Sequence, residues 1–244
     1  MTGLTAAQFT NDVMARQSDE ELHKIRRYFK AGAGGDFVGV RMGEVFALAK
    51  TYADLPPDEI EQLLDSPVHE LRAGALRIMS NQYAAKKTTP ARRQELFDLY
   101  LSRHDRINNW DLVDLAAPYV IGAHLLDRPR DVLYELARSG NPWERRTAIF
   151  STMTFVRRGD CGDTYALAEI LLDDREDLVQ KPTGGMLREA GKHDLPALLA
   201  FLDAHAAVMP RTTLRYAIER LTPAERAGYL KSTSANARPP ASRG

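Results

Sequence analysis

The sequence lacks cysteine almost entirely: Cys161 is the single one among 244 residues, which excludes an internal disulfide and a cysteine-rich zinc site. It also lacks any run of about 18 apolar residues, so no transmembrane helix is expected. The N-terminal stretch turns acidic and polar too early for a secretory signal. We therefore expect a cytoplasmic protein that does not engage a membrane.

The formal net charge is zero, because 33 basic residues are matched by 33 acidic ones. This balance argues against a highly basic coat protein that binds nucleic acid without specificity. It does not exclude a local basic groove, since phosphates respond to nearby charge. The distribution of charge therefore matters more than its sum.

Signatures of several common chemistries are absent. The six histidines show no spacing typical of a metal site, and we expect most of them at the surface. Cys161 has no obvious activating base, and no serine-nucleophile signature is present. The glycines at 31–37 lack the spacing and the preceding strand of a nucleotide fingerprint, so we expect a flexible loop there. We predict neither a metal nor an organic cofactor.

Strand-like alternation is missing too, and apolar residues recur at spacings of three and four, which predicts helices. Several are preceded by Ser, Thr or Asn followed by proline, the usual start of a helix. The predicted helices lie near 5–16, 19–30, 41–53, 57–65, 67–85, 90–103, 109–126, 129–138, 142–157, 162–173, 176–191, 194–206, 210–221 and 223–231.

So many short helices with short connections predict an all-α fold, a curved α-solenoid of stacked antiparallel helix pairs of the HEAT-like type. One helix of each pair then lines a concave surface, which suits a long ligand such as a protein segment or a duplex. We expect residues 1–231 to form one such domain. Residues 232–244 have no large apolar side chain and are expected to be a disordered tail.

The stretch "NNWDLVD" at 108–114 places Trp110 four residues before Asp114, so both lie on one face of a predicted helix. A flat ring and a carboxylate are each suited to holding a positive charge. The structural alternative is that Trp110 packs between repeats while Asp114 forms a cap or a salt bridge. Asp111 is expected to be a first-turn carboxylate that favours the helix dipole.

Residues 138–158 hold five arginines and one acid, the strongest basic run in the globular part. Arg146 falls among apolar positions and needs a partner, either Asp114 or a phosphate. Downstream, Pro182 lies inside a helical pattern and should kink the helix or force a restart. Gly184 and Gly185 follow it, and they either permit close approach of a ligand backbone or mark the loss of something larger.

The sequence resembles the AlkD-like family of bacterial DNA alkylation repair proteins over roughly residues 20–230. The motifs that carry the resemblance, in the family's order and spacing, are "FVGVRMGEVFALAK", "NNWDLVD", "NPWERRTAIF", "VQKPTGGMLREAGK" and "MPRTTLRYAIERL". The resemblance implies a HEAT-like repeat DNA glycosylase for base excision repair that acts on double-stranded DNA carrying alkylated bases. We expect it to act as a monomer.

The family's activity implies hydrolysis of the N-glycosidic bond of cationic alkylpurines, such as 3-methyladenine and 7-methylguanine, without base flipping. In that mechanism Asp114 matches the catalytic aspartate and Trp110 a sugar-facing tryptophan, and together they stabilise an oxocarbenium-like sugar. Because an alkylated purine already carries a positive charge in the DNA, it leaves as a neutral base without being protonated, and no general acid is required.

The resemblance also assigns DNA contacts. Arg146 matches an arginine that grips the DNA backbone, Arg188 and Arg215 match positions on DNA-facing helices, and we place Arg145 of the basic run on the same surface. Gly185 departs from the family, which usually has a tryptophan there. The alternatives are therefore a DNA-structure-binding protein with weak or no excision, and a protein-binding scaffold.

Overall fold

The computed structural model describes residues 3–25, 27 and 35–235. Residues 31–34 of the loop expected at 31–37 and the chain after residue 235 lie outside these ranges. The regular structure of the described part is helical throughout, without a β-strand, and Asp36 and Val68 form only an isolated bridge. The prediction of an all-α fold is confirmed. The chain divides into two compact units, one ending at Arg128 and the other beginning at Pro129.

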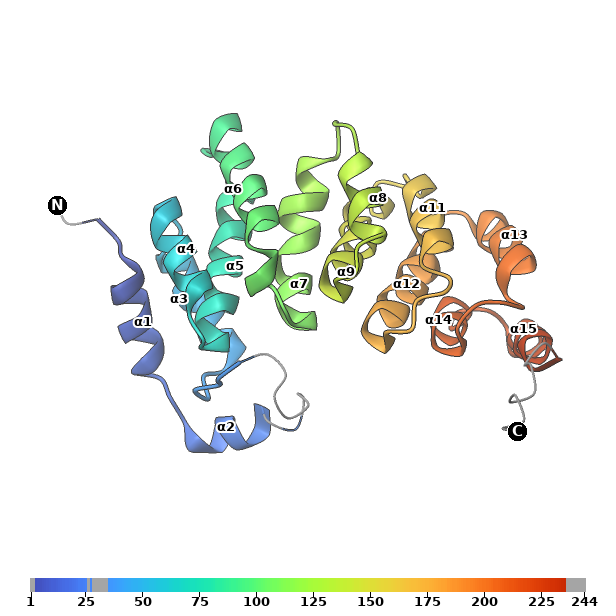
Figure 1. Cartoon of the computed structure of the whole chain (residues 1–244), viewed down its shortest axis with the longest axis horizontal. Coiled ribbons are helices and arrows are strands. Elements are labelled where there is room, and N and C mark those ends of the chain that lie inside the picture. The colour runs from blue at the N-terminus through green and yellow to red at the C-terminus, as the bar shows by residue number, and fades with distance from the viewer. Residues whose placement is uncertain (1–2, 26, 28–34, 236–244) are drawn as a thin grey trace, which may run out of the picture. The chain divides into compact units, whose positions relative to one another are not determined.

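The first unit is organised around α5, which packs against α3, α4, α6 and α7 (Figure 1). Its helices are α1 (Ala6–Met14), α2 (Asp19–Ile25), α3 (Met42–Thr51), α4 (Pro57–Asp65), α5 (His69–Ala84), α6 (Pro90–Ser102), the 3₁₀ turn η1 (His104–Arg106), α7 (Trp110–Ala116) and the π-helical segment η2 (Ala117–Gly122).

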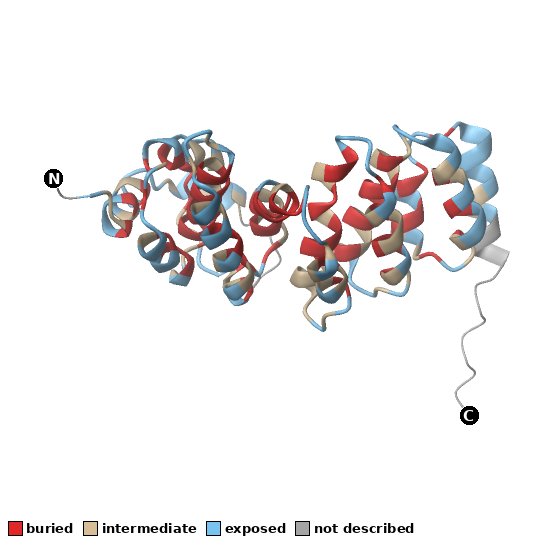
Figure 2. Ribbon diagram, turned by 90° about the horizontal axis from the view of Figure 1, so that it is seen from above, coloured by how far each residue is buried: buried red, intermediate tan, exposed pale blue. Residues whose placement is uncertain are grey.

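The second unit is organised around α12, which packs against α9, α11, α13 and α14. Its helices are α8 (Asp131–Ala137), α9 (Pro142–Ser151), α10 (Met153–Val156), α11 (Gly162–Ile170), α12 (Asp177–Ala190), α13 (Leu195–His205), α14 (Arg211–Ala217) and α15 (Pro223–Ala235). Figure 2 shows that buried residues line the sides on which neighbouring helices meet.

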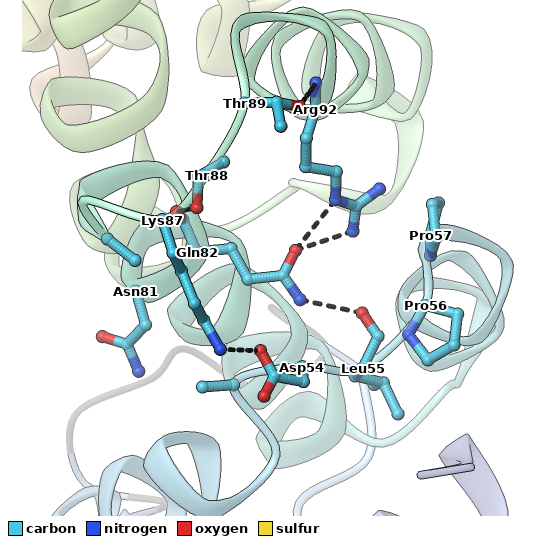
Figure 3. A pocket seen from close by; sticks show the side chains of 12 residues that line it. Asp54, Leu55, Pro56, Pro57, Asn81, Gln82, Lys87, Thr88, Thr89 and Arg92 are labelled. Atoms are coloured by element: carbon cyan, nitrogen blue, oxygen red, sulfur yellow. Dashed lines mark hydrogen bonds and ion pairs between the residues drawn. The ribbon is translucent and has the colours of Figure 1, made fainter.

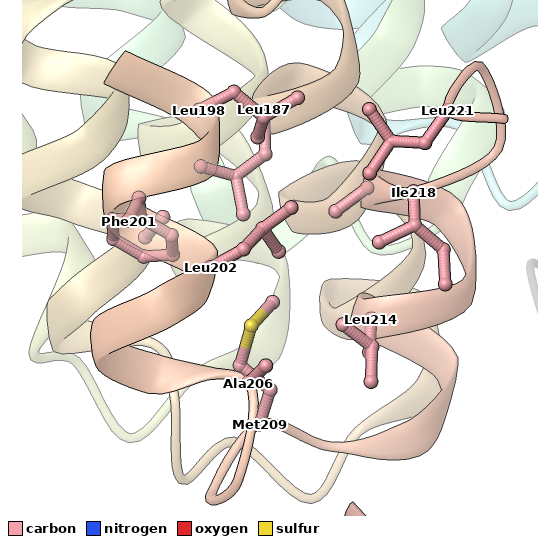
Figure 4. Close-up of a cluster of buried hydrophobic side chains, with 11 residues drawn as sticks. Leu187, Leu198, Phe201, Leu202, Ala206, Met209, Leu214, Ile218 and Leu221 are labelled. Atoms are coloured by element: carbon pink, nitrogen blue, oxygen red, sulfur yellow. The ribbon is translucent and has the colours of Figure 1, made fainter. Parts of the chain in front are cut away.

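The apolar core follows these two central helices. In the second unit, Leu187 of α12 meets leucines from α13 and α14, and Figure 4 shows how these side chains interdigitate. Leu202 and Leu214 are buried completely there. Burial of each such side chain is worth about 1.5–3 kcal/mol, so tertiary packing rather than helix propensity holds these short helices.

Several predicted helix starts are confirmed by their caps. The Thr89 hydroxyl accepts a hydrogen bond from the amide N–H of Arg92 at 3.1 Å, and Pro90 opens α6. The Asn141 side chain accepts from the amide of Trp143 at 3.0 Å, and Pro142 opens α9. These side chains satisfy amides that have no partner within the first turn.

Two of the predicted helices are interrupted before their expected ends. The segment 109–126 changes to a π-helical segment after Ala116, because Pro118 has no N–H to donate to the carbonyl four residues earlier. The segment 142–157 is divided at Thr152 into α9 and α10. At the other end of the chain, α15 extends to Ala235, four residues into the segment expected to be a tail.

Candidate functional site

Trp110 and Asp114 lie one turn apart on α7 of the first unit. Asn109 caps this helix, its side-chain oxygen accepting from the Trp110 amide at 2.8 Å, so Trp110 is the first residue of the helix. Positions four apart share a face, and both side chains are half-buried. A ring and a carboxylate therefore lie on the same, partly solvent-accessible face of one short helix.

The remaining faces of α7 anchor it to the unit. Leu112, Val113 and Ala116 are completely buried. Ser80 of α5 donates a hydrogen bond to the Leu115 carbonyl at 2.9 Å. These contacts fix the orientation of α7, which matters because a charge stabilises a reacting group only when its position is set in advance.

A buried histidine also holds the first turn of α7. Asp111 accepts from the amide of Leu112, as expected for a first-turn carboxylate, and its other oxygen lies 2.6 Å from His69 Nε2. The His69 ring packs on the Phe37 ring, with centroids 4.6 Å apart. Because these residues are far apart in the sequence, the sequence pattern gave no signal for this contact.

The expectation that most histidines lie at the surface is wrong. His69, His104 and His124 are buried, and each packs against an aromatic ring. His124 stacks on Phe97 with centroids 4.2 Å apart, and burial lowers its pKa below the ordinary value. A buried neutral imidazole costs little when one nitrogen is hydrogen-bonded, and Nδ1 of His124 lies 3.2 Å from the Tyr83 hydroxyl.

A buried carboxylate holds the segment that carries the N-terminal family motif. Glu70 is completely buried, and its oxygens accept from the amides of Val38, Gly39 and Val40 at 2.9–3.3 Å. Gly39 adopts a φ of +78°, a conformation that favours glycine. Glu70 therefore has a structural role, and this part of the motif is explained by folding rather than by ligand contact.

In the second unit, Arg145 is engaged in a structural ion pair. Its guanidinium binds the Asp174 carboxylate through Nε at 2.6 Å and Nη2 at 3.3 Å, and Nη1 donates to the Ser139 carbonyl at 2.9 Å. The Asp174 side chain is only 3% exposed. A bidentate pair of this kind ties α9 to the loop before α12.

Arg146 is buried. One of its partners is a backbone carbonyl, whereas the sequence suggested Asp114 or a phosphate. Its Nη1 donates to the Leu178 carbonyl on α12 at 2.5 Å, and its guanidinium lies 5.6 Å from the centre of the Phe150 ring. In an α-helix the Leu178 carbonyl would accept from the amide of residue 182. That residue is Pro182, which has no N–H. Arg146 therefore supplies the donor that the proline lacks.

This contact explains why the predicted restart at Pro182 does not occur: α12 is one helix from Asp177 to Ala190. We expect Arg146→Ala to lower the free energy of unfolding by about 1–3 kcal/mol, because the Leu178 carbonyl loses its donor. In a Pro182→Ala background the new amide replaces that donor, and the same substitution should cost about 1 kcal/mol less. Urea unfolding of the four proteins tests this; strict additivity would contradict it.

The two neighbouring glycines of α12 differ in their surroundings. A Cβ at Gly184 would overlap the Thr213 carbonyl oxygen and lie 2.6 Å from Tyr216 Cβ, so glycine is needed there for α14 to pack closely. A Cβ at Gly185 would meet no atom within 4 Å. From the sequence, the glycines either permit close approach of a ligand backbone or mark the loss of something larger. Gly184 instead allows α14 to pack closely against α12, and Gly185 borders open space.

The other two predicted arginines differ in their partners. Arg188 on α12 forms ion pairs with Glu189 and Glu219. Arg215 on α14 is exposed and makes no hydrogen bond or ion pair within the described part of the chain. Arg215 is therefore the more available of the two for an anionic ligand.

The polar groups of one further cavity have structural roles. A cavity of about 420 Å³ lies beside the C-terminal end of α5 (Figure 3). In it the Gln82 amide donates to the Leu55 carbonyl at 2.8 Å and accepts from Arg92 at 2.7 Å, so these polar groups hold the fold. Within residues 3–25, 27 and 35–235, no group of His, Cys, Asp and Glu side chains could hold a metal ion. No helix in those ranges is both long and apolar enough to span a bilayer.

Comparison with known proteins gives two findings. A family model described as DNA alkylation repair enzyme matches residues 10–221. A solved structure from Enterococcus faecalis, described as a predicted DNA alkylation repair enzyme, superposes with a TM-score of 0.68 at 16% identity, covering 85% of this chain and 98% of that one. At this identity the superposition shows a common fold. None of the curated proteins compared matches the sequence.

Proposed function

The chain belongs to the DNA alkylation repair enzyme family, and from that premise we propose that it is a DNA glycosylase. Its substrates are N3- and N7-alkylated purines in double-stranded DNA, and it hydrolyses their N-glycosidic bond. Family membership supports the role in alkylation repair. The partly exposed pair on α7, Trp110 and Asp114, supports the glycosylase chemistry.

The chemistry requires little from the protein. An alkylated purine carries a positive charge, so the C1′–N bond breaks with its electron pair going to the base, which leaves neutral. Positive charge then develops on the deoxyribose, and water adds to C1′ and loses a proton. The protein must stabilise the developing cation and position the water, while proton donation to the base is unnecessary.

Asp114 and Trp110 meet these two needs. The Asp114 carboxylate stabilises the cationic sugar and orients the attacking water. The Trp110 ring offers its electron-rich face to the same charge, a contribution of about 0.5–2 kcal/mol. Both act on a nucleotide that remains at the duplex rather than in a closed pocket. The π-helical segment η2, which begins three residues after Asp114, is a feature often found at functional sites.

The arginines contribute to DNA binding in different degrees. Arg215, exposed and without a partner in the described part of the chain, binds a phosphate directly. Arg146 grips the backbone near the lesion while it also caps the Leu178 carbonyl. Arg145 and Arg188 are held by acidic neighbours, so their contribution to affinity is smaller.

The test is release of 7-methylguanine and 3-methyladenine from methylated duplex DNA by the purified protein, followed by chromatography of the free bases. We expect release above the spontaneous rate, together with duplex binding that weakens as salt concentration rises. Release at the spontaneous rate would overturn the proposed function.

The open space at Gly185 favours one alternative, a protein that binds damaged or distorted DNA with weak or no excision. A ring at this position would add to the stabilisation of the sugar cation, and glycine offers none. Salt-sensitive binding to duplex DNA without base release would establish this alternative.

A further inference from the structure

One face of α12 combines an open space with a basic side chain. Gly185 is buried by its own helix and neighbours, yet a Cβ added to it would meet no atom within 4 Å. Lys181 lies one turn earlier on the same face. The open space at Gly185 and the Lys181 side chain therefore lie one turn apart on the same face of α12.

Tyr216 of α14 lies next to this face. Its Cβ packs against α12, 2.6 Å from the place that a Gly184 Cβ would occupy. Although its Cβ is packed, the residue as a whole is 38% exposed. Tyr216 therefore combines a packed first side-chain carbon with an outer part that reaches solvent.

The hydroxyl of Tyr216 distinguishes it from two other tyrosines of the same unit. The phenols of Tyr134 and Tyr229 donate to carboxylates of Asp163 and Asp203 at 2.6 and 2.8 Å. The Tyr216 side chain makes no hydrogen bond and no ring contact within the described residues. Its ring and hydroxyl are therefore available to a ligand.

The groups around this ring are mostly cationic. The pKa of Lys181 is raised, chiefly by its hydrogen bond to Asp177, with a smaller contribution of Tyr216 in the same sense and of Arg146 in the opposite sense. Tyr216 and Arg146 thus each lie within electrostatic reach of Lys181. Arg215 precedes Tyr216 on α14 and is exposed. An exposed ring among lysine and arginine side chains is the arrangement that nucleic-acid-binding surfaces use.

We infer that Tyr216 is a DNA-contacting residue whose ring packs against the sugar or base of one nucleotide beside the open space at Gly185. Lys181 and Arg215 bind the flanking phosphates. The inference rests on the proposed function only in that the ligand is DNA; it concerns binding and positioning of the nucleotide and assigns Tyr216 no chemical step. The nonpolar ring supplies contact area, and the cations supply the salt-dependent part of the affinity.

The test compares Tyr216→Leu with Tyr216→Phe. Leucine keeps the packing of the first side-chain carbons on α12 and removes the ring, whereas phenylalanine keeps the ring. By fluorescence anisotropy with a labelled duplex, we expect the leucine variant to bind about 5- to 30-fold more weakly and the phenylalanine variant within about twofold of the parent, as for other aromatic contacts to nucleotides. Tyr229→Leu is the control, because Tyr229 is a partly exposed tyrosine of the same unit whose hydroxyl is held by Asp203.

The salt dependence gives a second readout that a merely structural role would not produce. Tyr216→Leu should leave the slope of log affinity against log salt unchanged, since the ring carries no charge. Lys181→Ala and Arg215→Ala should each reduce the magnitude of that slope by about 0.9, the value expected for the loss of one phosphate contact. Parent-like affinity of Tyr216→Leu, an equal loss in Tyr229→Leu, or a changed slope in Tyr216→Leu would each overturn the inference.

The outcomes separate this inference from the proposed function. Duplex binding without base release defeats the glycosylase proposal, and Tyr216 is still judged on affinity. Base release by the parent, with unchanged affinity in Tyr216→Leu, defeats the Tyr216 inference alone. Absence of salt-sensitive DNA binding by the parent defeats both.

Discussion

Replacing Asp114 by asparagine should lower the rate of base release by about 100-fold, the order of loss seen when a preorganised electrostatic partner of a transition state is removed. Asparagine has the same size and keeps a polar oxygen, so the change removes the negative charge and little else. The burial of Leu112, Val113 and Ala116 should keep α7 in place. Affinity for undamaged duplex DNA should change little, because this carboxylate acts on charge that develops only during the reaction.

Asp111→Asn is the matched control, since Asp111 is a carboxylate on the same helix that binds His69 instead of facing the proposed substrate. We expect it to lower the midpoint of thermal unfolding and to leave release per folded molecule within a few-fold of the parent. The assay is single-turnover release of 7-methylguanine. Equal rates for Asp114→Asn and the parent would remove Asp114 from the mechanism.

Gly185→Trp should raise the rate of base release by about 2- to 30-fold. A ring at this position would find open space in the protein, and an aromatic face near a cationic sugar contributes about 0.5–2 kcal/mol. Replacing glycine within a helix should also stabilise the fold slightly. Gly185→Leu fills the same space without a ring, so it should not increase the rate.

Gly184→Trp is the control for the neighbouring position. A side chain there collides with the Thr213 carbonyl and Tyr216 Cβ, so we expect a loss of several kcal/mol of stability or failure to fold. Thermal unfolding followed by circular dichroism distinguishes the two variants. A rate for Gly185→Trp equal to that of Gly185→Leu would show that the missing ring does not limit this protein.

The sequence was sufficient for features that depend on local chemistry. The shared face of Trp110 and Asp114 follows from helical spacing. The starts of α6 and α9 follow from Thr89 and Asn141 with their prolines. Each of these depends on residues within one turn of each other, which is why a local pattern predicts them.

The features that sequence reasoning missed depend on distant partners. The contact of His69 with Asp111 joins residues 42 positions apart, and the contact of Arg146 with the Leu178 carbonyl joins residues 32 positions apart. The change at Pro118 could have been anticipated, because the missing N–H is a local property, but the periodic apolar pattern around it favoured one long helix. The different roles of Gly184 and Gly185 required knowing where α14 lies.

The pairing of Arg146 with a carbonyl freed by Pro182 constrains how this sequence can drift over generations. A lineage that acquires proline at this place tolerates it best when an arginine already faces the vacant acceptor. Once the proline is fixed, loss of the arginine becomes more harmful than it was for the ancestor. Among descendants, the two positions should consequently change together, with reversion of the proline preceding any replacement of the arginine.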